Sequence, residues 1–408
     1  MANLKIFTDN IEDQAREQID LLLSQEAFAD CKVRIMPDVH AGTGCVIGFT
    51  ADLGDKVIPN IVGVDIGCGV LCVRLGKLEI DLEKLDKYIK DNVPSGMEVH
   101  AEKDEKYEYK YEYANGFIKE LYCYDQLRNK DRLALSLGTL GGGNHFIEID
   151  EDEEGNKYLV IHTGSRNLGK QVAEIYQQIA YENCNTNKVE EQRREIIKRL
   201  KAEGRQREIQ AELAKFDKET KDYIPKDLCY LEGKNMQDYL HDMEICQKFA
   251  TSNRWNIATI IMKEIFYQSP TQVLDIIESV HNYLDFTDHI VRKGAIRAKD
   301  KEMVIIPLNM RDGCIIGVGK GNEDWNNSAP HGAGRLMSRM EARRELKVED
   351  FEKSMNGIYT TTADESTIDE SPMAYKNAQE IINAIGDTVE IIKIIKPIYS
   401  FKASDLIH

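Results

Sequence analysis

The sequence predicts an α+β protein: one large domain with mixed and antiparallel sheets, from which a charged helical arm extends. Short β-branched segments broken by glycines occur near the N-terminus and in the last third of the chain, and helical patterns lie between them. These segments alternate without a regular βαβ period and without an internal repeat, which disfavours a doubly wound parallel sheet. We therefore expect one domain over residues 1–408.

The first half of the chain shows helix and strand patterns in a clear order. Residues 11–30 have the apolar spacing of an amphipathic helix, and residues 32–75 have short β-branched runs separated by glycine, typical of strands and turns. Residues 80–132 are polar and helical in pattern. Residues 136–149 then predict a loop that leads into a strand, and residues 158–166 predict a strand that leads into a loop.

The second half begins with the most highly charged stretch. Residues 186–222 predict a helical hairpin or arm, interrupted at Gly204, whose charges form a solvated face. Residues 235–285 again have a helical pattern. The last third predicts strands at 303–308 and 313–319 and helices at 335–346 and 376–385.

Composition narrows the function classes. The chain has 53 basic and 70 acidic side chains, a net charge of −17, so it is not a general nucleic-acid binder, and any basic surface for RNA must be local. Nine cysteines without framework spacing are typical of a reducing cytosol rather than of a secreted disulfide scaffold. The N-terminus has no apolar signal segment, and no apolar run is long enough to span a bilayer. These features predict a cytoplasmic protein that does not enter the membrane.

The segment SAPHGAGR, residues 328–335, places His331 between a proline and two glycines. Pro330 favours extended backbone before it, and Gly332 and Gly334 allow the main chain to pass close to a ligand. A neutral imidazole at this place is suited to be a metal ligand, a general base or a covalent nucleophile. A structural histidine in a turn before a helix is the alternative, and the segment alone does not distinguish these roles.

Further motifs contain residue types that bind metals. They hold Asp38 and His40 in MPDVHAGTG, Asp65 and Cys68 in VDIGCG, His145 in GGGNHF, His162 in VIHTGSRN and, on a predicted helix, His281 in SVHNY. Each motif alone is weak, because buried cysteines and hydrogen-bonded histidines are common in protein cores. Together, an aspartate, a cysteine and three histidines suit borderline metals such as manganese, cobalt or zinc, with Asp38 and His40 as groups that orient the ligands. Because a thiolate can bridge two metals and paired metals assist phosphoryl transfer, the sequence predicts a metal-assisted phosphoryl-transfer enzyme.

In this order, these motifs resemble the RtcB family of RNA ligases, enzymes that join RNA ends with GTP. The resemblance runs from MPDVHAGTGCVIGFT, residues 36–50, through AYKN to the final KPIYSFKA, and so covers nearly the whole chain. It implies a single RtcB-like domain with its sheets around a central metal cleft. It also implies two Mn²⁺ ions: Cys68 bridges them, His145 binds one, and the other is bound by Asp65, His162 and His281.

The resemblance further implies that His331 is the nucleophile that takes GMP from GTP as a phosphoramidate. A helix predicted to begin at Gly334 would point its N-terminal amides at the attached phosphate, and Tyr375 would stack on the guanine base. The full set implied for GTP binding is Asn144, Glu148, Asn282, Asn309, His331, Gly332, Gly334, Tyr375 and Lys402. The candidates for RNA contacts, chosen for their positive charge, are Arg166, Arg292, Lys293 and Arg335.

The reaction that this resemblance implies has three steps. A 2′,3′-cyclic phosphate end is opened to a 3′-phosphate, GMP moves from His331 to that phosphate, and a 5′-hydroxyl end attacks and expels GMP. The expected partners are GTP and RNA with such ends, and archease, a helper that many family members need, is a candidate partner. The sequence does not decide between RNA repair and tRNA splicing.

One segment departs from the family pattern. PLNMRDG, residues 307–313, stands where the family usually has a stretch like PGSMGT, so Asn309 replaces a serine near the expected nucleotide site. Two alternatives therefore stay open: a metal-dependent RNA-end hydrolase that opens cyclic phosphates without ligation, and a non-catalytic protein that binds RNA ends. The chain has no Lys-x-Asp-Gly segment and no Walker A loop, so neither a lysine-adenylating ligase nor a P-loop enzyme is indicated.

Overall fold

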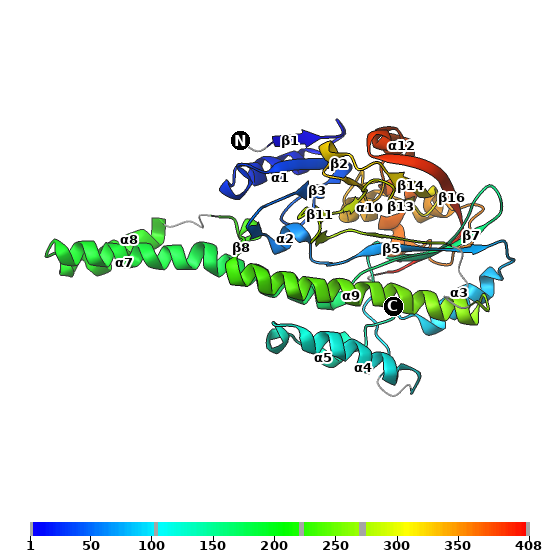
Figure 1. Cartoon of the computed structure of the whole chain (residues 1–408), viewed down its shortest axis with the longest axis horizontal. Helices are drawn as coiled ribbons and strands as arrows, with labels where there is room; N and C mark the ends of the chain where they lie inside the picture. The colour runs from blue at the N-terminus through cyan, green and yellow to red at the C-terminus, as the bar shows by residue number, and fades with distance from the viewer. Residues whose placement is uncertain (1–2, 102–104, 220–223, 269–274, 405–408) are drawn as a thin grey trace.

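The computed structural model describes residues 3–101, 105–219, 224–268 and 275–404 and has an α+β fold (Figure 1). The strands are β1 (Asn3–Ile6), β2 (Lys32–His40), β3 (Ile47–Ala51), β4 (Lys56–Val57), β5 (Gly69–Gly76), β6 (Phe146–Glu151), β7 (Lys157–Thr163), β8 (Leu231–Glu232), β9 (Ile276–Val280), β10 (Tyr283–Leu284), β11 (Val291–Lys293), β12 (Ala295–Arg297), β13 (Met303–Asn309), β14 (Gly313–Gly319), β15 (Ser328–Pro330) and β16 (Val389–Lys402). The helices are α1 (Asp13–Leu23), α2 (Pro59–Val62), α3 (Leu82–Asn92), α4 (Glu105–Glu120), α5 (Lys130–Ala134), α6 (Arg166–Tyr181), α7 (Asn187–Ala202), α8 (Ile209–Glu219), α9 (Gly233–Glu264), α10 (Arg339–Glu345), α11 (Val348–Ser354) and α12 (Ala378–Ala384).

Two large sheets form the body of the protein. One has five strands in the order β1-β2-β3-β11-β10, and the other has seven in the order β13-β14-β16-β6-β7-β5-β9. Strands that pair in the described residues are antiparallel except β1 and β2, which are parallel. Mixed and antiparallel sheets were predicted from the sequence, and this fold class is confirmed.

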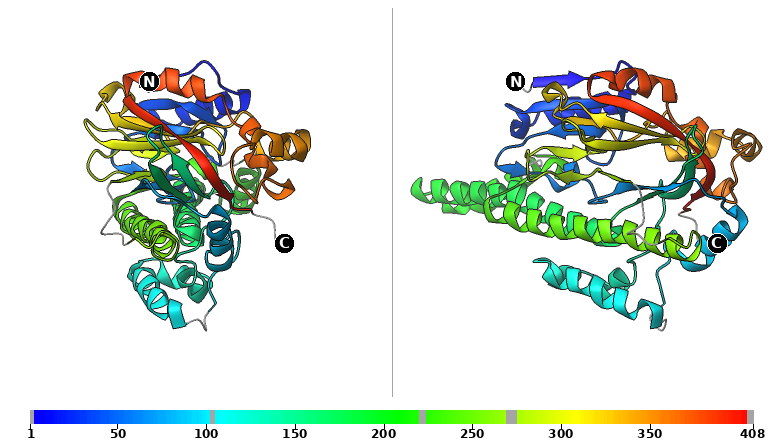
Figure 2. Two further views of the ribbon diagram at one scale, coloured as in Figure 1. Left: turned by 90° about the vertical axis from the view of Figure 1, so that its right-hand side faces the viewer. Right: turned by 45° about the vertical axis from the view of Figure 1, so that its right-hand side comes forward.

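The seven-stranded sheet curls until its two edges meet. At the seam the backbone N–H of Ile305 on β13 donates to Ser279 Oγ on β9 over 2.9 Å. The long strand β16 crosses the molecule as a curved ribbon and is irregular between Pro397 and Tyr399, where an extra residue lets it bend (Figure 2). The curled sheet therefore has an enclosed inner face and an outer face that must be covered by helices.

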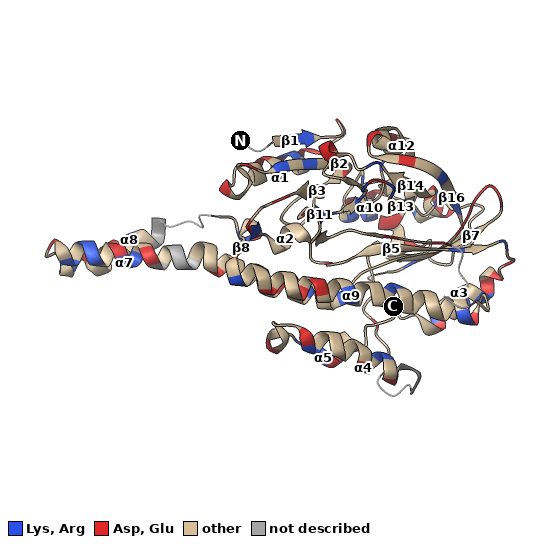
Figure 3. Ribbon diagram, viewed as in Figure 1, with Lys and Arg blue, Asp and Glu red and all other residues tan. Residues whose placement is uncertain are grey.

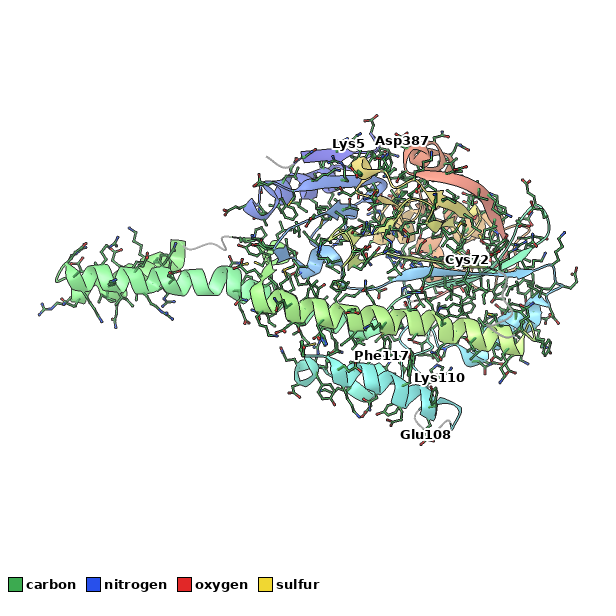
Figure 4. The ribbon with its side chains drawn as sticks, in the orientation of Figure 1. Lys5, Cys72, Glu108, Lys110, Phe117 and Asp387 are labelled. Atoms are coloured by element: carbon green, nitrogen blue, oxygen red, sulfur yellow. The ribbon has the colours of Figure 1, made fainter. Side chains whose placement is uncertain are left out.

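Helix α9 covers the outer face of the curled sheet. Ile257 and Ile261 of α9 pack with Leu71 and Ile147 of the sheet in one buried apolar cluster, and burial of such side chains contributes roughly 1.5–3 kcal/mol each. Helices α4 and α5 lie on the other side of α9, where Phe117 of α4, labelled in Figure 4, meets Phe249 of α9 with ring centroids 6.4 Å apart (Figures 1 and 4). The layers are therefore sheet, α9, and then α4 with α5.

The charged stretch that the sequence predicts as an arm contains α7 and α8. These helices contact each other and extend beyond the two sheets, with charges of both signs along them (Figure 3). Residues 220–222 of the predicted arm lie outside the described residues. A division of the chain into one domain with an inserted arm stays a prediction.

Three sequence predictions about local structure were wrong. The pattern at 235–285 predicted helix throughout, but α9 ends at Glu264 and the β-branched run IIESV forms β9, because it pairs with β5. His281 and Asn282 therefore lie in a turn after a strand and not on a helix; Asn282 has φ +69°, a left-handed conformation that asparagine tolerates.

The helix expected to begin at Gly334 is the third prediction that was wrong. The chain leaves β15 in a turn, and α10 begins only at Arg339, where Ser338 and Glu341 form a capping box. Gly334 has φ +77°, and a side chain there would collide with the backbone of Asp38. In the described part of the chain, the first α-helix after His331 is therefore α10.

All nine cysteines are buried and free of disulfide bonds, in agreement with the absence of a framework spacing. Among the helices in the described ranges, none combines the length and the apolar character that crossing a bilayer requires.

Candidate active site

A cleft of about 710 Å³ opens where the two sheets meet. This volume suits a nucleotide-sized ligand. Residues from both sheets and from the loop after β15 line it, and they include every residue expected to bind GTP: Asn144, Glu148, Asn282, Asn309, His331, Gly332, Gly334, Tyr375 and Lys402. The structure therefore brings together residues that lie far apart in the chain.

The predicted metal ligands converge: Asp65, Cys68, His162 and His281 line the cleft, and His145 contacts Asp65 and Cys68. Cys68 Sγ lies 3.3 Å from His162 Nε2 and 3.5 Å from His145 Nε2. His162 Nε2 lies 3.3 Å from His281 Nε2, and Asp65 Oδ2 lies 3.1 Å from His145 Nε2. Cys68 and the three histidines are buried.

The ligand atoms form two overlapping groups that share Cys68. One group is Cys68, His162 and His281, and the other is Asp65, Cys68 and His145, with all atoms of a group within 4.8 Å of one another. The family resemblance implies Asp65 beside His162 and His281, whereas the geometry places Asp65 with His145. Cys68 belongs to both groups.

Local sequence explains how Asp65 and Cys68 reach this position. Gly67 has φ +72°, and a side chain at Gly69 would meet the Ser279 carbonyl at 2.8 Å, so both glycines are needed for the tight turn before β5. Arg254 of α9 is fully buried and donates to the carbonyls of Gly67 and Thr163 over 2.9 and 2.8 Å. Sequence reasoning missed Arg254, because one arginine within a helical pattern carries no signal of such a role.

Hydrogen bonds fix the tautomers of two of the histidines. His145 Nδ1 lies 2.9 Å from the Leu140 carbonyl, and His162 Nδ1 lies 3.1 Å from the Asn144 carbonyl. A carbonyl oxygen only accepts, so each Nδ1 carries the hydrogen and each Nε2 of a neutral ring presents a lone pair.

These lone pairs explain why the cluster fits a metal. They face a carboxylate, a sulfur and another imidazole nitrogen at 3.1–3.5 Å, so several groups that can donate a lone pair converge on one small volume. In addition, Asp65 Oδ1 is buried without a hydrogen-bond partner among the described residues. The donor set of nitrogen, sulfur and oxygen suits borderline divalent ions.

Burial sets the protonation of the cluster. It lowers the pKa of His162 and of His281 well below the ordinary value, so both rings are neutral near pH 7, the form that binds metals. Burial, and then the neighbouring Asp65 carboxylate, raises the pKa of the Cys68 thiol well above its ordinary value. A bound divalent ion opposes this effect, because a coordinating thiol is deprotonated.

His331 lies beside this cluster, and its Nδ1 is held by a hydrogen bond to Asp38. Its Nδ1 lies 2.7 Å from Asp38 Oδ2, and its backbone N–H donates to the same oxygen over 3.1 Å. The ring centroid of His331 is 4.7 Å from that of His281. Because the carboxylate holds the Nδ1 hydrogen, the neutral ring keeps the lone pair of Nε2 for chemistry in the cleft.

His40 also contacts Asp38, through the backbone. Its Nδ1 lies 2.9 Å from the Asp38 carbonyl, and burial lowers the pKa of His40 to about 4. Asp38 and His40 were predicted to orient metal ligands. The structure instead places the Asp38 carboxylate on His331.

An acidic centre that sequence reasoning missed organises the other wall of the cleft. Glu370 is buried and contacts Lys402 Nζ at 3.0 Å, Arg335 Nη1 at 3.1 Å and the Tyr375 hydroxyl. Burial opposes its ionisation, but Lys402, Arg339 and Arg335 lower the pKa of Glu370 to about 2. Glu370 follows no recognisable motif, so only the tertiary contacts identify it.

Several of the expected nucleotide contacts are also bonded within the protein, and Asn309 and Glu148 are among them. Asn309 Oδ1 accepts the backbone N–H groups of Arg311 and Asp312, and Asn309 Nδ2 donates to Asp312 Oδ2 over 2.8 Å, so this side chain holds the hairpin between β13 and β14. Glu148 Oε1 accepts from Ser400 Oγ over 2.9 Å.

The four candidates for RNA contacts differ in exposure. Arg335 lines the cleft, and its guanidinium lies 5.2 Å from the centre of the Tyr375 ring. Arg166 donates to Thr139 Oγ1 and to the Gly96 carbonyl. Arg292 and Lys293 are buried; Arg292 pairs with Asp288, and Lys293 donates to backbone carbonyls. The structure therefore does not support a direct phosphate contact from Arg292 or Lys293.

The protein therefore has an α+β fold with a buried cluster of residues that can bind metal. Beside this cluster lies a histidine, His331, that is hydrogen-bonded to the carboxylate of Asp38. The family model described as tRNA-splicing ligase RtcB matches residues 23–403. The chain is 32% identical over 432 residues to RNA-splicing ligase RtcB of Escherichia coli strain K12, covering 98% of this chain and 97% of that protein. It is 28% identical to tRNA-splicing ligase RtcB of Aeropyrum pernix, covering 86% of this chain and 84% of that protein. This protein belongs to the RtcB family.

Proposed function

We propose that this protein is an RNA ligase that joins a 3′-phosphate or 2′,3′-cyclic phosphate end to a 5′-hydroxyl end through a GMP-histidine intermediate. Membership of the RtcB family and relatives named as RNA-splicing ligases support the RNA ligase activity. The observation that carries the proposal is the position of His331, which is held by Asp38 and adjoins the metal-capable cluster in one cleft.

In this proposal His331 Nε2 attacks the α-phosphate of GTP, so that an N–P bond forms and pyrophosphate leaves. Asp38 retains the Nδ1 hydrogen and stabilises the positive charge that develops on the ring during attack. His331 then gives GMP to the RNA 3′-phosphate. The 5′-hydroxyl of the second end attacks the activated phosphate and GMP leaves.

Two manganese ions are proposed for the cluster, held by Cys68 together with Asp65, His145, His162 and His281. Bound there, they would neutralise charge on the phosphates and lower the pKa of a water that opens a cyclic phosphate. Arg254 and the two backbone carbonyls that bind His145 and His162 keep the ligands in place.

The guanine nucleotide is proposed to lie along the wall formed by Tyr375, Lys402 and Asn282. Tyr375 presents its ring while its hydroxyl is bonded to Glu370, which orients the ring for stacking on a base. For RNA, Arg335 and Arg339 at the cleft are the better candidates, because they line it. Archease as a helper protein stays a prediction.

Transfer of label from GTP tests the proposal directly. The protein is incubated with α-³²P-GTP and manganese, and the expected result is an acid-labile label on the wild type and none on His331→Ala. His241→Ala is the matched control, because His241 lies on α9, stacks on Tyr122 and is outside the cleft. Absence of label on the wild type would contradict the proposal.

Joining of RNA ends separates the ligase from the hydrolase alternative. Two RNA fragments, one with a 3′-phosphate and one with a 5′-hydroxyl end, are expected to be joined in the presence of GTP. Label on His331 without joining, together with opening of cyclic phosphate ends, would favour the hydrolase. Because the Asn309 side chain is bonded within its own hairpin, Asn309→Ser is expected to change the yield of joined product only slightly.

A further inference from the structure

Asp38 lies in an irregular stretch of β2. Residues 36–39 of β2 stand opposite Gly48 alone on β3, because regular pairing resumes only at His40. Such a bulge leaves backbone groups without partners in the ladder and turns side chains away from their regular directions. The Asp38 carboxylate reaches His331 from this bulge. The carbonyl groups of the bulge therefore need hydrogen-bond donors from outside the ladder.

Lys376 provides these donors. Its Nζ donates to the carbonyl of Pro37 over 3.2 Å and to that of Val39 over 2.9 Å, and these two residues flank Asp38. A third hydrogen bond of 2.9 Å goes to the carbonyl of Asn10. An ammonium group has three hydrogens, so every donor of Lys376 Nζ is used. The lysine therefore joins the bulge of β2 to the segment before α1.

The backbone of Lys376 is bonded to the loop after His331. Its N–H donates to the Gly334 carbonyl over 3.0 Å. The preceding residue, Tyr375, forms a β-bridge with Arg335 of the same loop. Lys376 also lies just before α12, which contacts β2 (Figure 1). One residue therefore connects the loop of His331 with the bulge that carries its carboxylate partner.

Lys376 and Asp38 are also two buried groups of opposite charge. Their exposed fractions are 5% and 0%, and Asp38 Oδ1 has no hydrogen-bond partner among the described residues. Across the described chain, no carboxylate forms an ion pair with Lys376 at contact distance. Burial lowers the pKa of Lys376, and the charge of Asp38 opposes this shift more than any other group does. Because a buried charge without an opposite charge nearby is costly, each of the two groups stabilises the other.

We propose that Lys376 is a positioning residue that keeps the Asp38 carboxylate on His331. Its three hydrogen bonds fix the bulge of β2, and its charge offsets the charge of the carboxylate. This inference rests on the proposed function, in which Asp38 prepares His331 to take GMP. Lys376 contacts neither the nucleotide nor the RNA in this proposal and acts only through Asp38.

The Nδ1 hydrogen of His331 tests this link without any need for ligase activity. In the full-length protein labelled with ¹⁵N-histidine, a hydrogen that is held by a charged carboxylate gives a downfield proton resonance, which His331→Ala identifies by its loss. Lys376→Gln removes the charge but keeps two donor hydrogens, and it is expected to weaken this resonance. Lys130→Gln is the matched control, because Lys130 donates to the Leu127 carbonyl at the start of α5, outside the cleft. A folded Lys376→Gln protein with the wild-type resonance would overturn the proposal.

A double-mutant cycle tests whether Lys376 acts through Asp38. The single-turnover rate of label transfer from saturating GTP should fall about 10-fold in Lys376→Met, and Lys130→Met should keep the wild-type rate. In the Asp38→Asn background, Lys376→Met should cause no further loss, because the charged carboxylate that Lys376 positions is absent. Independent effects on the free energy add, so that the two losses in rate multiply. Multiplied losses in the double variant would overturn the proposal and leave Lys376 with a general stabilising role.

Conservative substitution keeps the test decisive where Lys376→Met fails to fold. Lys376→Arg retains the positive charge, so it should keep more of the Nδ1 resonance and more of the rate than Lys376→Gln. Equal losses in these two folded variants would exclude a role for the charge and overturn the proposal. If the wild type takes no label from GTP, the proposed function fails, whereas the resonance still shows whether Lys376 holds Asp38 on His331.

Discussion

Asp38 Oδ2 accepts hydrogen bonds from both Nδ1 and the backbone N–H of His331, at 2.7 and 3.1 Å. Asp38 is buried on β2, whereas His331 follows β15, almost 300 residues later in the chain. The pair fixes the ring so that one nitrogen remains for reaction. Substitution of Asp38 therefore tests the proposed GMP-histidine intermediate directly.

Replacement of the anchoring carboxylate should slow guanylylation of His331. Asp38→Asn weakens a charge-assisted hydrogen bond of about 1.5–3 kcal/mol, which corresponds to a rate reduced about 10- to 100-fold. The measurement is the single-turnover rate of label transfer from GTP. Asp52→Asn, at an exposed turn where Asp52 accepts from Gly54, should leave the rate unchanged. An equal loss in both variants would argue against orientation by Asp38.

Loss of the shared thiolate should remove metal from both groups of ligands. Cys68→Ala takes a ligand from each of the two groups, so bound manganese and thermal stabilisation by manganese should both be lost. Manganese per chain and the midpoint of thermal unfolding are the measurements. Cys31→Ala should behave like the wild type. Retention of both ions in Cys68→Ala would show that Cys68 does not bridge them.

Stability of the metal-free protein should fall in mildly acidic solution, and His40 should contribute to this fall together with His162 and His281. Burial lowers the pKa of His40 from 6.5 to about 4, so between these values the unfolded chain binds a proton that the folded protein does not. The stability is therefore complete above pH 6.5 and decreases as the pH falls toward 4, by at most about 1.4 kcal/mol per pH unit for one group.

Denaturant unfolding at several pH values in the presence of EDTA measures this effect. His40→Asn should have a smaller slope of stability against pH than the wild type, whereas His241→Asn should keep the wild-type slope. Identical slopes for all three proteins would show that His40 does not cause the acid sensitivity.

Neutralising the acidic centre of the cleft wall should affect both stability and nucleotide binding. Glu370→Gln leaves Lys402 and Arg335 without their buried partner, and breaking such pairs costs about 3–5 kcal/mol. The KM for GTP should rise because Tyr375 and Lys402 are no longer held. Glu365→Gln, on the exposed side of the same short helix, is the control. A lower stability with an unchanged KM would restrict Glu370 to a structural role.

Arg339 should contribute to RNA affinity through phosphate contact. Its side chain is 41% exposed, it lines the cleft, and it lies within 4 Å of Asp369 and Glu370. Arg339→Ala should weaken RNA binding and reduce the slope of log K against log salt by about 1. Arg344→Ala, on the same helix but paired with Glu345, should leave the slope unchanged. An unchanged slope in Arg339→Ala would mean that no phosphate is contacted there.

The local motifs were predictable because they depend on short-range chemistry. Glycines around Asp65, Cys68, His145 and His331 showed where backbone approaches a ligand, and the donor types indicated a metal. The strand of β9 was not predictable in this way. The apolar run of β9 has a pattern that is also compatible with a helix. It forms a strand because it pairs with β5, and pairing between strands distant in the chain overrides the local pattern.

By itself, the sequence determined the α+β class, the positions of the candidate ligands and the family resemblance, since these follow from residue types and their spacing. Only the tertiary structure decided which groups meet. It placed Asp38 on His331, Asp65 with His145, and Glu370 among Lys402, Arg335 and Tyr375. It also buried Arg292 and Lys293 within the protein. Each of these outcomes depends on contacts between residues far apart in the chain, which no local pattern encodes.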